Sequence, residues 1–362
     1  DETRFDDWSR VYQLLRSEVN PATGTVGNTL TDNTWFDAAS HAIKSLPSGS
    51  KEFTKTTFDS LGRPIVSYKG YDLDETTYAE ASSVADDVIL EQTETIYDHA
   101  SNCIQTTTRQ RYHTAPDSQT GPLQNTTTTP KARVTYQTMY PDALGRTVAT
   151  VNYGTHGGTS LSRPATIPAP SDAVLVTLLT YNAAGHVATQ TNLAGIVTSF
   201  EYDAAGRRTS VTLNATGSSG SSSSSSSSSA GGCATSDDVN VTVLTRFNAD
   251  GNVSSITARN YVTSDQVTQY VYGTTLDDSE IASSLLKRAE IYPDSVDDDD
   301  QILFTYNRQR QTVSITDQNG TVHALDYDKL GRQIHDRVTT LGTDVDGSIR
   351  RLSTTYEVRG MK

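Results

Sequence analysis

The sequence is poor in the residues that build compact cores and metal sites. Its 362 residues include two tryptophans and two cysteines, and hydrophobic residues make up 35% of the chain. Two cysteines exclude a disulfide scaffold and a zinc site made of several cysteines. Cys103 and Cys233 are far apart in the chain. We interpret them as unpaired small apolar residues, and a disulfide between them is the alternative.

Basic residues and long apolar runs are also scarce. Lysine and arginine total 29 against 43 acidic residues, so the net charge is −14. This balance disfavours nucleic acid as a partner, because such binding depends on basic patches. It also disfavours anionic membrane surfaces. Because no apolar run reaches about 18 residues, the sequence predicts no membrane-spanning helix, and no secretory signal is recognisable from Asp1 onward.

The sequence is rich in one short motif: an aromatic residue, Asp or Asn, two variable residues, Gly and usually Arg. Its clearest copies are residues 58–63, 202–207 and 327–332. Asp or Asn suits the first corner of a type I turn, and Gly suits the fourth position, where φ is positive. Such a turn commonly joins two strands of a hairpin. The motif therefore predicts structural turn residues at Asp59, Gly62, Arg63, Asp142, Gly145, Arg146, Asn182, Gly185, Tyr202, Asp203, Gly206, Arg207, Asn248, Gly251, Tyr327, Asp328, Gly331 and Arg332.

Two stretches, residues 181–206 and 306–331, contain further Asp/Asn-x-x-Gly turns at spacings of ten or eleven residues. Strands of about six residues fit between such turns. The sequence thus predicts an all-β fold: a long antiparallel meander of repeated β-hairpins in a curved or spiralling sheet. We expect residues 11–19 to form a strand, although their apolar residues also fit helical spacing. Residues 281–290 are the one segment for which we predict a short helix.

Some copies replace the turn Gly. Ser9, Ser40, Ser101 and Arg310 stand at that position. A residue with a side chain is disfavoured in the left-handed conformation by about 1 kcal/mol. We therefore predict that these four turns relax to another type.

The motif resembles the Rhs/YD-repeat family, which includes bacterial Rhs proteins, the shell subunits of Tc toxins and the YD shells of teneurins. The resemblance covers nearly the whole chain and implies a β-sheet that spirals into a hollow shell, part of which this chain would form. In bacterial members such a shell can enclose a C-terminal toxic domain. The self-cleaving core of toxin members is not recognisable in this sequence. We interpret the chain as an internal piece of a longer secreted or cell-surface protein, with the remainder of the parent polypeptide as its partner.

We interpret residues 1–362 as a single repeat array with insertions. Residues 214–238 are rich in Ser and Gly, with an almost unbroken Ser run at residues 218–229, and predict a flexible loop. Residues 293–301 form an acidic loop in this interpretation. Residues 115–130 and 153–170 carry Pro, Gly and Thr and are expected to leave the repeat as long excursions.

The residues that suggest chemistry have structural explanations. The recurring Arg and aromatic residues could bind a ligand, but a catalytic site needs a unique constellation and these residues recur. We expect each Arg to cover an aromatic ring or to pair with a turn Asp. The segment beginning at Asp344 has neither the Gly nor the Glu that a calcium loop requires. The sequence predicts no catalytic residue, no cofactor and no metal site.

Three functions remain in order of preference. The first is a structural and interaction segment of a bacterial Rhs/YD-repeat protein, part of a β-shell around a toxin domain. The alternative is a repeat module that binds carbohydrate or a cell envelope, with cell-surface glycans as partners. An enzyme ranks third.

Overall fold

The computed structural model describes residues 1–20, 22–72, 77–216, 239–260, 263–293 and 300–357. Most of the predicted Ser/Gly-rich loop, most of the acidic loop and Cys233 lie outside these residues. Cys103 is a half-buried free cysteine. Within the described residues the chain divides into two compact units. The first comprises Asp1–Thr180 with Thr191–Gly195, and the second comprises Tyr181–Gln190 with Ile196–Lys362.

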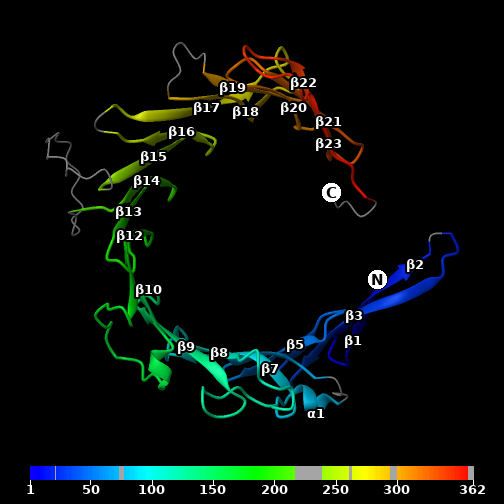
Figure 1. Ribbon diagram of the computed structural model, residues 1–362, viewed down its shortest axis with the longest axis vertical. Coiled ribbons are helices and arrows are strands. Elements are labelled where there is room, and N and C mark those ends of the chain that lie inside the picture. Colours follow the sequence, from blue (N-terminus) through cyan, green and yellow to red (C-terminus); the bar gives the residue numbers. More distant parts are fainter. Residues whose placement is uncertain (21, 73–76, 217–238, 261–262, 294–299, 358–362) are drawn as a thin grey trace. The chain divides into compact units, whose positions relative to one another are not determined.

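The first unit is an antiparallel meander in which each strand pairs with the next strand in sequence. Figure 1 shows these strands from blue to green. They are β1 (Glu2–Phe5), β2 (Val11–Val19), β3 (Val26–Phe36), β4 (Ala42–Leu46), β5 (Glu52–Phe58), β6 (Pro64–Tyr71), β7 (Val88–Tyr97), β8 (Cys103–Arg111), β9 (Ala132–Pro141), β10 (Thr147–Gly154) and β11 (Leu175–Tyr181). One short helix, α1 (Tyr78–Ala81), and a 3₁₀ turn, η1 (His156–Gly158), lie in the connections.

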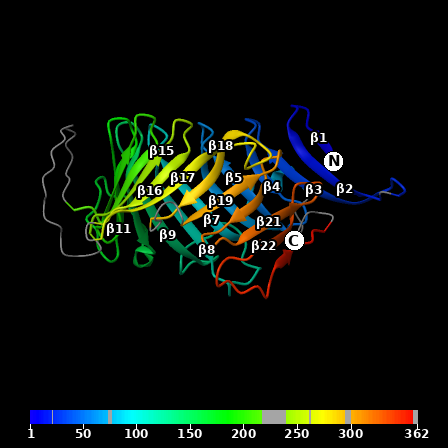
Figure 2. The same ribbon diagram turned by 90° about the horizontal axis from the view of Figure 1, so that it is seen from above.

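The second unit repeats the same architecture, and Figure 2 shows β15 to β17 side by side. Its strands are β12 (Val187–Thr191), β13 (Val197–Tyr202), β14 (Arg208–Leu213), β15 (Val241–Phe247), β16 (Val253–Ala258), β17 (Gln266–Thr274), β18 (Ser283–Ile291), β19 (Gln301–Tyr306), β20 (Thr312–Thr316), β21 (Val322–Tyr327), β22 (Gln333–Thr340) and β23 (Arg351–Ser353). The antiparallel all-β meander that the motif spacing predicted is confirmed in each unit.

The expectation for residues 11–19 is confirmed, because they form strand β2. The short helix predicted at residues 281–290 is wrong. Strand β18 occupies this segment and pairs with β17 on one side and β19 on the other. Alternate residues Ala289 and Ile291 are buried. The apolar spacing of this short segment fits both structures, and pairing with two neighbours decides in favour of the strand.

The core lies on one face of the first unit. Alternate residues of β9 are buried, as a sheet with one covered face requires. The two expected excursions contribute to the cover: Leu123 of the first joins one buried cluster, and Leu161 of the second packs against the other, as does Val174 just beyond it in the chain. In the second unit, strands such as β20 and β21 are half-exposed at every position. This low burial agrees with the low hydrophobic content of the chain.

Candidate functional site: the repeat turns and a neighbouring pocket

The copy at residues 202–207 shows how the motif residues are held. Asp203 Oδ1 accepts hydrogen bonds from the backbone N–H groups of Ala205 and Arg207, both at 2.9 Å. Asp203 Oδ2 accepts from Arg207 Nε at 2.8 Å. The Gly206 N–H donates to the Asp203 carbonyl at 3.0 Å, and Gly206 has a φ of +76°. The whole motif is thus one closed hydrogen-bonded turn between β13 and β14.

The other predicted turn residues adopt the same geometry within their own copies. The Arg side chain pairs with the turn Asp at 2.6–2.7 Å in Asp59–Arg63, Asp142–Arg146 and Asp328–Arg332. The Asn copies keep the backbone bonds: the N–H groups of Gly185 and Gly251 donate to the carbonyls of Asn182 and Asn248. Gly62, Gly145, Gly185, Gly251 and Gly331 all have positive φ.

The turn carboxylates are held in their ionised form. The hydrogen bond from the Arg207 side chain, followed by that from its backbone N–H, holds the pKa of Asp203 below its usual value. Arg146 lowers the pKa of Asp142 in the same way. For Asp59 the largest cause of the lowered pKa is the backbone N–H of Arg63. A carboxylate bound in this way is a poor general acid near neutral pH.

The prediction that the Ser and Arg corners relax to another turn type is wrong. Ser9, Ser40, Ser101 and Arg310 keep φ between +61° and +69°. In two of these turns the hydroxyl is bound by an arginine of the preceding copy: Arg10 Nη1 lies 3.2 Å from Ser40 Oγ, and Arg63 Nη1 lies 3.1 Å from Ser101 Oγ. The turn network and this extra bond offset the local cost of the left-handed conformation.

The repeat arginines also reach forward to the next copy. Arg63 Nη1 donates to the Asp98 carbonyl at 3.2 Å, and its guanidinium lies 4.7 Å from the centre of the Tyr97 ring. Arg207 covers the Phe247 ring at 4.5 Å. These contacts are the ones expected from the sequence: the Arg covers an aromatic ring through a cation–π contact and pairs with a turn Asp.

The repeat tyrosines use their hydroxyl groups within the sheet. Tyr202 donates to the Val187 carbonyl at 3.0 Å, and Tyr327 donates to the Thr312 carbonyl at 2.7 Å. Tyr97 makes the equivalent bond to Pro64 at 3.0 Å. In each case the acceptor lies directly after the turn of the preceding motif copy, so the tyrosine links neighbouring copies.

Where His or Asn replaces the motif Arg, its side chain limits the space at the fourth corner of the next copy's turn. His41 stacks on Phe58 at 4.6 Å, and its Nε2 lies 2.7 Å from the point where a Cβ on Gly62 would stand. Asn102 Oδ1 lies 2.8 Å from the equivalent point at Gly145. A side chain at either position would have to displace His41 or Asn102, so Gly is favoured there for space as well as for φ. Sequence reasoning missed this link, although the pairing of Arg with a following Ser and of His or Asn with a following Gly is visible in the first five copies.

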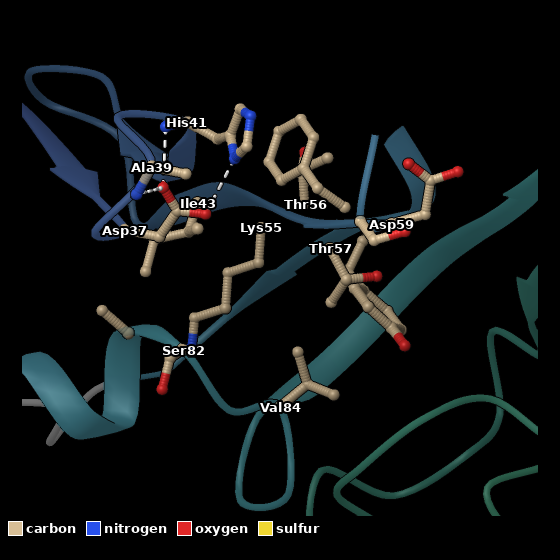
Figure 3. Close-up of a pocket in the computed structure, with 14 residues that line it drawn as sticks. Asp37, Ala39, His41, Ile43, Lys55, Thr56, Thr57, Asp59, Ser82 and Val84 are labelled. Carbon is tan, nitrogen blue, oxygen red and sulfur yellow. Dashed lines mark hydrogen bonds and ion pairs between the residues drawn. The ribbon is translucent and has the colours of Figure 1, made fainter. Parts of the chain in front are cut away.

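A pocket of about 410 Å³ lies beside the turns of two copies in the first unit (Figure 3). Ile43, Phe58, Tyr68 and Val84 supply apolar walls. His41 Nδ1 lies 2.9 Å from Asp37 Oδ2, within the same copy. The pocket therefore contains an Asp–His pair, but this pair belongs to the turn network.

Lys55 lies at the base of this pocket and is almost fully buried. Its ammonium donates to the carbonyls of Glu80 and Ser83 at 2.8 and 2.7 Å, and to Asp87 Oδ2 at 2.7 Å. These bonds fasten the segment that contains α1 to the sheet. Sequence reasoning missed Lys55, because a lysine inside a strand gives no indication that it is buried.

The described ranges contain no group of three or more His, Cys, Asp or Glu side chains that could hold a metal ion. Nor does any helix in the described part of the chain have the length and apolar character needed to cross a membrane.

Comparisons with known proteins add the following. The structure is similar to those of solved Tc toxin chains: TcdB2-TccC3 without its hypervariable C-terminal region (12% identity, TM-score 0.37, 99% of this chain and 20% of that one), TcdB2-TccC3 (13%, 0.33, 93% and 19%) and the Tc holotoxin pore of Photorhabdus luminescens (12%, 0.30, 98% and 22%). The chain thus spans about a fifth of the length of these proteins. A search of curated proteins found no match. The family model described as RHS Repeat matches residues 181–218. The chain therefore carries an RHS repeat at residues 181–218, and the resemblance to the Rhs/YD-repeat family that its Tyr-Asp motif indicated is confirmed.

Proposed function

We propose that this chain is a wall segment of a β-shell in a larger secreted or cell-surface bacterial protein, and that the shell encloses a toxin domain of the same polypeptide. The observation that carries this proposal is that the repeat side chains bind one another, within a copy and between neighbouring copies. In the copy at residues 202–207, Asp203 and Arg207 bind each other, Arg207 covers the ring of the next copy, and the Tyr202 hydroxyl bonds the preceding strand. Side chains engaged in such contacts stabilise the sheet, as the wall of a shell requires.

The polar character of the strands supports the same function. In the second unit most strand positions are half-exposed, and strands such as β16 (Val253–Ala258) carry Ser and Thr. A wall with polar faces encloses another chain without offering it an apolar surface to bind. The RHS repeat match at residues 181–218 supports this assignment at the level of the family.

Protease protection of the full-length parent polypeptide tests the enclosure. We expect the sequence that follows the repeats to resist a protease while the repeats are folded. It should become cleavable when a turn is disrupted by Gly206→Val. A downstream sequence that is cleaved at the same rate in both proteins would contradict enclosure.

A carbohydrate-binding module would give a different result. If the chain were such a module, a glycan array would show saturable binding that Tyr202→Phe or Tyr327→Phe reduces. If the chain is a wall segment, we expect neither substitution to change the signal on the array, because both hydroxyls already donate to backbone carbonyls. A loss of binding in a variant that remains folded would favour the module over the wall.

A further inference from the structure

One strand of the first unit has a long edge that no neighbouring strand covers. Strand β3 runs from Val26 to Phe36, but β4 pairs with only its last four residues, Asn33 to Phe36. Figure 1 shows the far end of the β2–β3 hairpin extending beyond the neighbouring strands of this unit. We call residues 26–32 of β3 the free edge. Among the described residues it pairs with β2 on one side and with no strand on the other.

The turn that follows β3 shows where the backbone groups of the free edge point. The Asp37 N–H donates to the His41 carbonyl at 3.0 Å, so the backbone of Asp37 is directed toward β4. This direction alternates from residue to residue along an antiparallel strand. The N–H and C=O groups of Thr29 and Thr31 therefore point to the same side, beyond the last residue that β4 pairs. These four groups are complementary to another extended strand.

The free edge lacks the features that usually prevent a strand from pairing with another chain. Such features are charged residues, Pro and covering segments, and residues 26–31 contain neither a charge nor Pro. The comparable stretch of β18, residues 283–288 before its pairing with β19, carries Lys287 and Arg288. There the Lys287 carbonyl also accepts a hydrogen bond from the Tyr306 hydroxyl at 2.7 Å. The free edge of β3 is thus open to strand addition.

The sequence of the free edge is complementary to a second copy of itself. If two free edges run antiparallel about a two-fold axis at Leu30, the two leucines face each other. Thr29 of each copy then lies opposite Thr31 of the other, and all four outward backbone groups of each copy are paired. Opposed threonines stabilise a sheet, and the leucine pair buries apolar surface of a side chain that is 53% exposed in one copy.

Charge permits this contact although the whole chain is acidic. Residues 16–32 contain one Arg, one Glu and one Asp, so the net charge of the hairpin is −1 (+1 − 2). Arg16 and Asp32 pair with each other at 2.8 Å. In the two-fold arrangement Asp32 of each copy lies opposite the uncharged Asn28 of the other. Repulsion between more distant charges is screened beyond about 8 Å at physiological salt.

We infer that the free edge of β3 pairs with the free edge of a second copy of this chain. The product is an antiparallel, two-fold dimer, in which one contact covers the free edges of both copies. An unrelated extended peptide would cover only one of them. The register of β3 against β2 shifts between Thr29 and Val26. Such a bulge bends a strand, so the tip of one copy turns away from β4 of the other.

Cysteine cross-linking tests the arrangement of the two strands. Residues opposed at a non-hydrogen-bonded pair have Cα atoms about 4.5 Å apart, within the range of a disulfide. In a chain with Cys103→Ser and Cys233→Ser, we expect Leu30→Cys to form a covalent dimer in mild oxidant. Thr29→Cys alone should stay monomeric, whereas a mixture of Thr29→Cys and Thr31→Cys chains should cross-link. Cross-linking of Thr29→Cys to itself, without cross-linking of Leu30→Cys, would overturn the inference.

Sedimentation equilibrium of the 362-residue chain at micromolar concentrations measures the association without a cross-link. We expect a reversible dimer whose dissociation constant rises about tenfold or more in Leu30→Glu, because like charges then face each other. Arg16 lies opposite position 30 within the hairpin, so the new carboxylate has a partner in its own copy. Circular dichroism with thermal melting would verify folding.

Ile96→Glu is the matched control, because Ile96 is a strand residue that is 50% exposed and already pairs with β8. This variant should leave the dissociation constant unchanged. A chain that stays monomeric at all concentrations would overturn the inference, as would a dimer that Leu30→Glu does not weaken or that both glutamate variants weaken equally.

Discussion

The guanidinium of Arg63 lies 4.7 Å from the centre of the Tyr97 ring, although the two residues belong to different copies of the repeat. The same arginine pairs with Asp59 in its own turn. One side chain therefore closes a turn and fastens it to the next. Repeat arrays depend on such contacts between neighbours, because no unit has a core of its own.

Replacement of Arg63 by lysine tests this double role. Arg63 donates from Nε to Asp59 Oδ2 and from Nη1 to the Asp98 carbonyl. A lysine ammonium is a point charge and cannot reproduce this fork. We expect Arg63→Lys to lower the melting temperature by about 2–4 °C. Arg133→Lys, at an exposed position of β9 outside the turns, is the control and should leave melting unchanged. Equal melting of both variants would show that the forward contact adds nothing.

Comparing alanine substitutions at two glycines separates the requirement for positive φ from the requirement for space. Gly206 and Gly195 have φ of +76° and +78°. A Cβ on Gly206 would lie 3.1 Å from His186, whereas a Cβ on Gly195 would meet nothing within 4 Å. We expect Gly195→Ala to reduce the free energy of unfolding by about 1 kcal/mol and Gly206→Ala to reduce it by more. Chemical denaturation measures both. Equal losses would contradict the close approach of His186.

Gly206→Val is the harsher form of the same test. A β-branched residue resists the left-handed corner, and its side chain would crowd His186 further. We expect a loss on the order of a few kcal/mol. Unchanged melting would show that the turn between β13 and β14 is wrongly assigned.

The turn carboxylates predict a loss of stability in acid. The pKa of Asp203 is lowered in the folded state, chiefly by hydrogen bonds from Arg207. The stabilisation is therefore complete above the unfolded pKa of about 3.9 and is lost as pH falls through the folded pKa. We expect the melting temperature to be flat from neutral pH to about 5 and to fall steeply below about 4.

Asp203→Asn shows whether the turn carboxylate causes that acid transition. The amide keeps the Oδ1 acceptor, as Asn182 does in its own copy, where it accepts from the His186 N–H at 3.0 Å. It loses the ion pair with Arg207. The variant should melt lower at pH 7 and show a shallower decline in acid. An unchanged decline would place the acid sensitivity in other groups.

The fold was predictable where local chemistry decides it. Asp203 and Gly206 stand at the two corners of a turn, so their spacing alone defined the hairpin. The left-handed serines were not predictable in this way. Ser101 is held by Arg63, and a contact between copies is invisible to reasoning about one turn. Residues 281–290 were mispredicted for the same reason, because pairing with β17 and β19 determines their conformation.

The burial of Lys55 was the least predictable feature. Replacement of Lys55 should strongly reduce the free energy of unfolding. Lys55 and Asp87 form an ion pair at 2.7 Å with both side chains 3% exposed. Lys55→Met would leave the Asp87 carboxylate buried without this partner, and we expect a loss of about 3–5 kcal/mol. The double variant Lys55→Met with Asp87→Leu removes both charges and should recover most of that loss. Thermal melting distinguishes the single variant from the double variant, and protease cleavage near α1 gives a local measure of the same difference. If the single and double variants are equally unstable, the carbonyl bonds of Lys55 matter more than the ion pair.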